Sequence, residues 1–127
     1  MGYYSDVYFA TTKEGFDFLL KEKVLREELF PYADRIKYNA KDNCVLVCWD
    51  MIKWDDTDPE FPEYIFVNAL PILEKKDIPF HYLRLGEQIG DIEAYSYKER
   101  EGNLPILYPT QRICFYPEDW DGEEIKI

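Results

Sequence analysis

The stretch Cys44-Val45-Leu46-Val47-Cys48-Trp49-Asp50-Met51-Ile52-Lys53-Trp54 decides the fold that this sequence predicts. Its first half is apolar at every position, as expected of a strand that is covered on both faces. Its second half leads into Asp55-Asp56-Thr57-Asp58-Pro59-Glu60-Phe61-Pro62-Glu63, a loop crowded with carboxylates. We therefore expect a buried central strand that delivers two tryptophans and an acidic loop to one edge of the molecule.

The composition predicts a single globular domain over residues 1–127. A chain of 127 residues, 17% of them aromatic, can bury a core without disulfides or metals. Fifteen Lys and Arg against 26 Asp and Glu give a formal net charge of −11. This charge repels phosphate backbones and anionic membranes, so we expect basic protein surfaces as partners, without nucleic acid or membrane binding. The alternative is that the acidic surface serves solubility alone.

The three cysteines, Cys44, Cys48 and Cys114, each lie in an apolar run. Cys44 and Cys48 are four positions apart on one strand, which separates them by about 13 Å and precludes a disulfide between them. Buried thiols are typical of a reducing compartment. The first residues lack the features of a signal peptide, and no apolar run approaches the roughly 20 residues of a membrane span. The sequence therefore predicts a cytoplasmic protein.

Strand and helix patterns follow one another in the order β-α-β-β-α-β-β-β. A first helix is expected after the first strand, with Thr11 and Glu14 as a capping box and Pro31 as its stop. A turn at 41–43 joins two strands into a hairpin. The predicted strands cover residues 3–10, 36–38, 44–52, 80–85, 91–97 and 112–116, with a short extended piece at 104–108.

The second helix is expected to begin after the acidic loop, with Asp58 or Phe61 as its cap. Pro71 lies inside its apolar pattern and predicts a kink or break near Leu70. The order of elements predicts an α+β domain with a mainly antiparallel sheet and two helices packed on one face. The version that we favour is a ferredoxin-like (split βαβ) variant with extra C-terminal strands. The acidic tail over 118–127 is expected to be loosely held.

Sequence motifs for catalysis are absent. His81 is the only histidine, which excludes a multi-histidine metal site and favours a structural role in its strand. Gly86 and Gly90 are four positions apart, but the Lys and Ser or Thr of a phosphate-binding loop do not follow them. The acidic loop starts like a calcium loop, but Phe61 and Val67 stand where that motif requires Gly and Glu. We assign no cofactor.

A carboxylate site for Mg²⁺ or Mn²⁺ is the alternative enzymatic interpretation. It requires acids from several strands to converge in one pocket, as oxygen ligands of hard metal ions do. The other interpretation of these acids is a solvated face and caps at helix N-termini. The acids of this hypothesis are Asp6, Asp50, Glu87, Asp91 and Glu93, with His81 beside them.

Aromatic side chains beside acidic ones indicate a protein interface. Trp49 is expected in the core, whereas Trp54, flanked by Lys53 and Asp55, is the candidate anchor. Carboxylates around aromatic anchors complement an Arg-rich groove of the kind that binds nucleic acid. The predicted binding residues are Trp54, Asp55, Asp56, Asp58, Glu60, Glu63, Tyr64, Tyr95 and Tyr97.

Three stretches carry a resemblance to a known group: Gly2-Tyr3-Tyr4-Ser5-Asp6-Val7, Trp49-Asp50-Met51-Ile52-Lys53-Trp54, and Tyr82-Leu83-Arg84-Leu85-Gly86-Glu87 followed by Asp91-Ile92-Glu93. They resemble small phage- and prophage-borne hypothetical proteins that begin Gly-Tyr-x-Ser-Asp-Val and carry a Trp-x-x-Val-Lys-Trp strand end. The group has no established activity. The resemblance implies a phage or mobile-element setting, in which small acidic proteins inhibit host systems as anti-CRISPR or other anti-defence proteins. Leu85 departs from the Ile that is usual in the group.

The residues shared with that group form either a structural motif or a functional site. In the structural interpretation, Asp6 and Glu87 accept hydrogen bonds from Lys53 or Arg84 and fasten the ends of strands. The shared residues are Ser5, Asp6, Trp49, Lys53, Trp54, Arg84, Glu87 and Asp91.

The function that the sequence favours is a small acidic, non-enzymatic binding protein that inhibits a host protein by occupying a basic surface. A metal-dependent enzyme is one alternative. An immunity protein for a bacterial toxin is another, with the same binding chemistry and a different partner. The edge strands and exposed aromatic residues also permit a homodimer.

Overall fold

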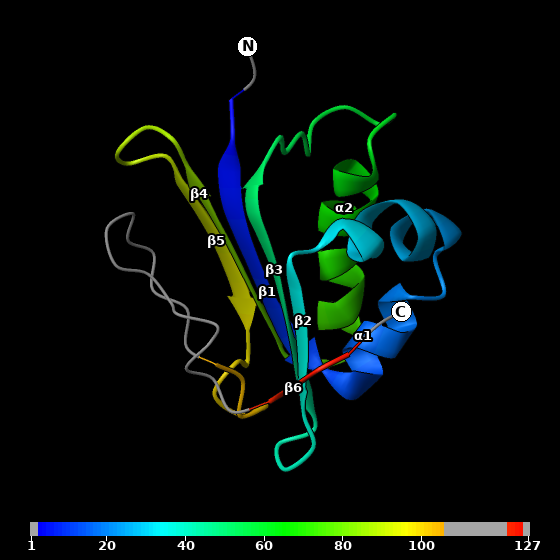
Figure 1. Ribbon diagram of the computed structural model, residues 1–127. Helices are drawn as coiled ribbons and strands as arrows, with labels where there is room; N and C mark the ends of the chain where they lie inside the picture. Colours follow the sequence, from blue (N-terminus) through cyan, green and yellow to red (C-terminus); the bar gives the residue numbers. More distant parts are fainter. Residues whose placement is uncertain (1–2, 106–121, 126–127) are drawn as a thin grey trace.

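The computed structural model describes residues 3–105 and 122–125, which form one antiparallel sheet with helices on one of its faces (Figure 1). The six strands lie in the order β5-β4-β1-β3-β2-β6. The predicted α+β class with a mainly antiparallel sheet is thus confirmed, and its ferredoxin-like (split βαβ) version stays a prediction. The strands are β1 (Ser5–Thr12), β2 (Arg35–Asn39), β3 (Cys44–Ile52), β4 (Phe80–Gly86), β5 (Ile92–Tyr97) and β6 (Glu123–Glu124).

Strand β3 lies in the middle of the sheet, between β1 and β2, with the bounds that its apolar run predicted. Its residues from Cys44 to Trp49 are all buried, because both faces of the sheet are covered there. Val45, Val47 and Trp49 belong to the core under the helices. Cys44, Leu46 and Cys48 belong to a second, smaller cluster on the opposite face, and the first and third of these are free thiols.

The first helix is shorter than the sequence predicted, because the chain turns after residue 19. It is divided into α1 (Lys13–Leu19), a π-helical turn η1 (Leu25–Leu29) and a 3-10 turn η2 (Phe30–Tyr32). The predicted cap was wrong by one residue. Thr12 caps α1 by accepting a hydrogen bond from the Gly15 N–H at 3.1 Å. Thr11 instead lies in β1, where its hydroxyl donates to the Pro79 carbonyl at 2.8 Å.

The second helix, α2 (Pro62–Lys75), begins as predicted, with Phe61 at the N-cap and Pro62 in the first turn. The predicted break near Leu70 was wrong, since α2 continues through Pro71 to its end. Pro71 is exposed, whereas Phe66, Leu70 and Leu73 are fully buried. Packing of that apolar face on the sheet therefore outweighs the backbone hydrogen bond that proline removes.

The core under the helices is aromatic, with Phe66 of α2 at its centre. Its ring packs against Phe9 with centroids 4.9 Å apart and against Trp49 at 5.9 Å. Trp54 and Tyr82 also contact it, at 5.9 Å and 6.0 Å. This cluster fixes the end of β3 against α2 and so positions the loop between them.

The C-terminal part is described only at 122–125, where β6 pairs with β2 through Lys37 opposite Glu124 and Tyr38 opposite Glu123. That part of the predicted loose tail is therefore held against the sheet. The predicted strand 112–116 and most of the extended piece 104–108 lie outside the described residues. Within residues 3–105 and 122–125, no helix has the length and apolar character needed to cross a membrane.

Candidate functional site

The acidic loop 53–61 lies at the end of the molecule where β1 begins and where β4 turns into β5 (Figure 1). Exposed apolar side chains gather at this same end. Phe61 in the loop is 44% exposed and Met51 at the end of β3 is 65% exposed. We call this region the apical surface and define its apolar members as Tyr3, Tyr4, Met51, Phe61 and Ile89.

Two shallow pockets adjoin the apical surface, and Phe61 and Lys53 line both. The first has a volume of about 310 Å³ and is completed by Tyr3, Trp54 and Asp55. The second, of about 490 Å³, extends from Phe61 toward η1 and η2, and its lining includes Met51. Tyr3, Met51 and Phe61 therefore border concave surface.

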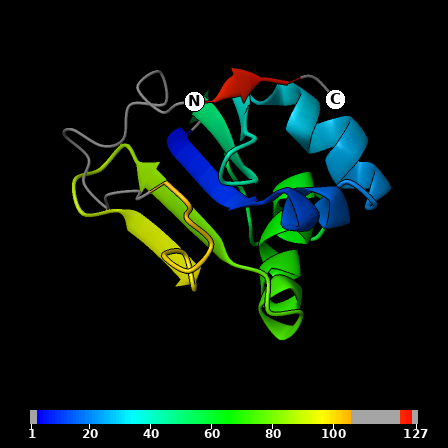
Figure 2. The same ribbon diagram turned by 90° about the horizontal axis from the view of Figure 1, so that it is seen from below.

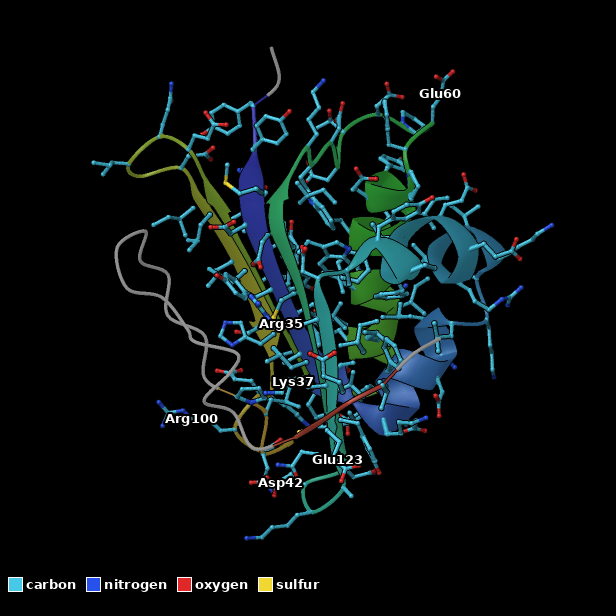
Figure 3. The ribbon with its side chains drawn as sticks, viewed as in Figure 1. Arg35, Lys37, Asp42, Glu60, Arg100 and Glu123 are labelled. Atoms are coloured by element: carbon cyan, nitrogen blue, oxygen red, sulfur yellow. The ribbon has the colours of Figure 1, made fainter. Side chains whose placement is uncertain are left out.

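Short local hydrogen bonds give the acidic loop its shape. The Asp55 carboxylate accepts from the Thr57 hydroxyl at 2.8 Å and from the Thr57 N–H at 3.1 Å. The Asp58 carboxylate accepts from the Glu60 N–H at 3.0 Å, so it stabilises the loop and does not cap α2. Figure 3 shows Glu60 at the tip of the loop, pointing away from the body of the protein.

Trp54 and Glu63 are less accessible than the sequence suggested. Trp54 is half-buried, its ring packs against Trp49 at 5.3 Å, and its Nε1 has no hydrogen-bond partner among the described residues. Glu63 is only 7% exposed. Burial raises the pKa of the Glu63 carboxyl, and the neighbouring charges of Asp55 and Asp56 raise it further. Phe61 is thus the most exposed aromatic residue of the loop, and sequence reasoning missed it as a binding residue.

The carboxylates of the loop and of Glu63 have no Lys or Arg partner in an ion pair within the described part of the chain. Burial raises the pKa of the Asp56 carboxyl, and the negative charge of Glu93 on β5 raises it further. By contrast, hydrogen bonds from Thr57 lower the pKa of Asp55. The loop therefore concentrates negative charge, and its carboxylates form no ion pair with a Lys or Arg of the described chain.

Arg84, Ser5 and Asp91 of the predicted structural motif form a side-chain network beside the apical surface. Arg84 of β4 donates to the Ser5 hydroxyl at 2.9 Å, to Asp91 at 2.7 Å and 3.3 Å, and to Glu93. The Tyr3 hydroxyl donates to Asp91 at 2.6 Å. Burial alone would lower the pKa of the Arg84 guanidinium, but the hydrogen bonds to Asp91 and Glu93 outweigh it and raise the pKa.

The predicted partners of Asp6 and Glu87 were wrong. The Asp6 carboxylate accepts from the Met51 N–H at 2.9 Å, at a bulge in the pairing of β1 with β3. Glu87 accepts from the Tyr4 N–H at 2.7 Å. Both carboxylates therefore accept hydrogen bonds from backbone N–H groups. Lys53, one of their predicted partners, is exposed in the loop. Trp49 is fully buried, as predicted.

The acids of the metal hypothesis do not converge. Asp6 lies opposite Leu85, on the sheet face away from the helices, and Asp50 forms an ion pair with Arg35 at 2.8 Å. Asp91 forms an ion pair with Arg84. Arg84 lies opposite Val7, which belongs to the core under the helices, so this ion pair is on the other face of the sheet from Asp6. Among residues 3–105 and 122–125, no group of three or more His, Cys, Asp or Glu side chains is placed to hold a metal ion.

Two of the predicted binding tyrosines lie away from the loop, and the third, Tyr64, follows the loop in the first turn of α2 but lines another surface. Tyr95 and Tyr97 on β5 donate hydrogen bonds to Glu74 and Asp77 at the other end of α2. Tyr64 lines an apolar groove of about 490 Å³ between α1 and α2. His81 is half-buried in β4, and its Nδ1 has no hydrogen-bond partner among the described residues. The predicted binding set therefore divides into separate surfaces.

The chain matches no protein-family model, no curated protein and no solved structure.

Proposed function

We propose that this protein is a small acidic, non-enzymatic binding protein whose apical surface occupies a basic surface of a partner protein. One observation carries the proposal: the end of the molecule that bears exposed apolar side chains also bears the loop 53–61, whose carboxylates lack an ion-pair partner in the described chain. Protein interfaces combine an apolar, aromatic centre with a polar rim in this way. Exposed apolar side chains gathered at one end of an otherwise charged surface also favour a binding role.

The charge of the partner follows from the charge of the loop. A net charge of −11 and the acids of the loop steer the protein toward a positive patch and away from nucleic acid. An Arg-rich groove on a host protein that handles nucleic acid fits these requirements. The resemblance to phage-borne proteins supports a role as an inhibitor of the anti-defence or anti-CRISPR type, acting in the host cytoplasm.

The test is capture of partners from a bacterial lysate on the immobilised protein, with washes at low and high salt. Exposed charges are screened over about 8 Å at physiological ionic strength, so the partner should be retained at low salt and released at high salt. A variant with a neutralised loop should lose the partner, with an affinity at least about tenfold lower. Its substitutions are Asp55→Asn, Asp56→Asn, Asp58→Asn and Glu60→Gln, which keep the side-chain carbonyl oxygens that shape the loop.

A matched control removes the same number of charges elsewhere on the surface and should bind like the wild type. Its substitutions are Glu14→Gln, Asp17→Asn, Glu22→Gln and Glu101→Gln, all at exposed positions. If both variants lose the partner equally, net charge alone drives binding and the apical surface is not the site. Retention of the partner by the loop variant would also contradict the proposal.

A further inference from the structure

Within residues 3–105 and 122–125, strand β5 forms an open edge of the sheet. Among the described strands it pairs only with β4, and Figure 2 shows none of the described helices or strands beyond it. Glu93, Ala94, Tyr95 and Ser96 are all exposed. The strand Ile92–Tyr97 contains no Pro and no Lys, the residues with which proteins usually protect such an edge from pairing.

The register identifies which backbone groups face outward. The Gly86 N–H donates to the Asp91 carbonyl at 2.8 Å, and the pairing continues from Leu85 opposite Ile92 to Phe80 opposite Tyr97. Hydrogen-bonded pairs alternate in an antiparallel ladder, so Tyr95 bonds to β4 while Ala94 and Ser96 direct their N–H and C=O groups outward. These outward groups have no partner within the described chain.

Two tyrosines of β5, Tyr95 and Tyr97, each donate a hydrogen bond to a carboxylate at the C-terminal end of α2 or just beyond it. The Tyr97 hydroxyl donates to Asp77 at 2.6 Å, and the Tyr95 hydroxyl donates to Glu74. The buried Phe80 ring packs against both, with centroids 4.9 Å from Tyr95 and 6.4 Å from Tyr97. Each unit thus presents an aromatic ring and a carboxylate side by side.

The Tyr97–Asp77 unit already binds a cation from its own chain. The Lys98 ammonium lies 5.5 Å from the centroid of the Tyr97 ring and 2.8 Å from the Asp77 carboxylate. No Lys or Arg of the described chain contacts the Tyr95–Glu74 unit. The second unit therefore has the chemistry of an ammonium or guanidinium site, next to an open strand edge.

We propose that β5 binds an extended basic segment of a partner protein as an added antiparallel strand, with a Lys or Arg of that segment in the Tyr95–Glu74 unit. A residue opposite Tyr95 on the outer side would occupy a non-hydrogen-bonded pair, where side chains lie closest together. The stretch 87–101 carries five acids and two basic residues, which favours a basic segment. A second copy of β5 would bring Tyr and Glu, not a cation, to this unit. This lateral edge is separate from the apical surface, so either proposal can fail alone.

The test uses a six-residue peptide of alternating Val and Lys with blocked ends. Its pairing should slow hydrogen exchange at the outward amides of Ala94 and Ser96, as measured by NMR. A control peptide with N-methylated Val residues keeps the charge but cannot form the ladder, and it should bind at least about tenfold more weakly. Absence of binding, or equal binding of the two peptides, would overturn strand addition.

Variants of the protein test the cation unit. Glu74→Gln should weaken binding of the peptide about five- to tenfold, because it removes the negative charge beside the Tyr95 ring. Asp77→Asn is the matched control and should leave the affinity unchanged, since Lys98 already occupies that carboxylate. Equal losses in both variants would indicate general charge attraction and overturn the assignment of the unit.

Ala94→Pro tests the edge itself. Proline at this position removes an outward N–H and spares the ladder to β4, so the variant should fold but no longer bind the peptide. Well-dispersed amide resonances would establish that Ala94→Pro is folded. If it does not fold, the Glu74→Gln variant and the N-methylated peptide test the proposal in its place. If the wild type sediments as a dimer and Ala94→Pro as a monomer, the edge pairs with a second copy and the proposal is wrong.

Discussion

The Arg84 guanidinium holds the Asp91 carboxylate with two hydrogen bonds, from Nη2 to Oδ1 at 2.7 Å and from Nη1 to Oδ2 at 3.3 Å. This bidentate pair joins the two ends of the turn between β4 and β5. Tyr3 donates to the same carboxylate, which ties the start of the described chain to that turn. A side chain at Gly86 would lie against Asp91 and Tyr3, so glycine at this position leaves the space that the network needs.

Asp91→Asn should reduce stability in a pH-dependent way. Hydrogen bonds from Arg84, and then from Tyr3, hold the pKa of Asp91 below its usual value of 3.8. A lowered folded-state pKa adds stability that is present above the unfolded-state value and is lost as the pH falls through the folded-state value. The urea midpoint of the wild type should therefore exceed that of Asp91→Asn at neutral pH. The difference should shrink below about pH 4.

Glu22→Gln is the control for this measurement, because Glu22 is exposed and lies away from the network. Its midpoint should stay close to that of the wild type at every pH. A difference between the wild type and Asp91→Asn that persists unchanged at low pH would contradict the charge-based explanation.

His81 should make folding less favourable as the pH falls below neutrality. Burial lowers the pKa of His81 from its usual 6.5, and Glu99 opposes this only in part. Because the unfolded chain takes up a proton near pH 6.5 that the folded chain does not, stability is lost as the pH falls between that value and the folded-state pKa. His81→Gln should remove this part of the pH dependence. NMR titration of the imidazole checks the direction, and a pKa above 6.5 would show it to be wrong.

Cys44 should resist alkylation in the folded protein. Burial raises the pKa of its thiol to about 11, and the charge of Asp42 adds to this effect. The thiolate is the reactive species, so iodoacetamide at about pH 8 should modify Cys44 only after denaturation. Mass spectrometry of a Cys114→Ser variant isolates Cys44 and Cys48, which are both buried. Rapid modification of Cys44 under native conditions would contradict this prediction.

Phe66→Ala should lower the free energy of unfolding by about 3–5 kcal/mol, because it empties the centre of the aromatic core. Urea unfolding followed by tryptophan fluorescence measures the change, since Trp49 and Trp54 both contact the Phe66 ring. Phe61→Ala is the matched control: this residue is 44% exposed, so stability should change by no more than about 0.5 kcal/mol. Comparable losses in both variants would show that Phe66 is not the centre of the core.

Part of the candidate site was predictable from the sequence because it depends on local chain order. The acidic loop must follow β3 directly, and its carboxylates must lie near Trp54. The apolar members of the apical surface were not predictable in the same way. Tyr3, Met51 and Ile89 come from three distant segments, and only the pairing of β1 with β3 and β4 brings those segments to one end.

The sequence by itself determined the elements whose signals are local. The apolar run that begins at Cys44 specified the central strand, and the prolines after Asp58 and Phe61 limited the start of α2 to two positions, because periodicity and proline geometry act over a few residues. Tertiary packing decided that α2 passes through Pro71, since burial of its apolar face outweighs a local backbone preference.

The tertiary structure alone decided which distant side chains meet. Ser5 and Arg84 are 79 positions apart, and Glu74 and Tyr95 are 21 apart. Their contacts depend on the strand order and register. These determine on which face of the sheet each side chain lies and which side chains are next to it. No periodicity along the chain encodes that order. The apolar part of the apical surface and the Tyr95–Glu74 unit therefore depend on the tertiary structure.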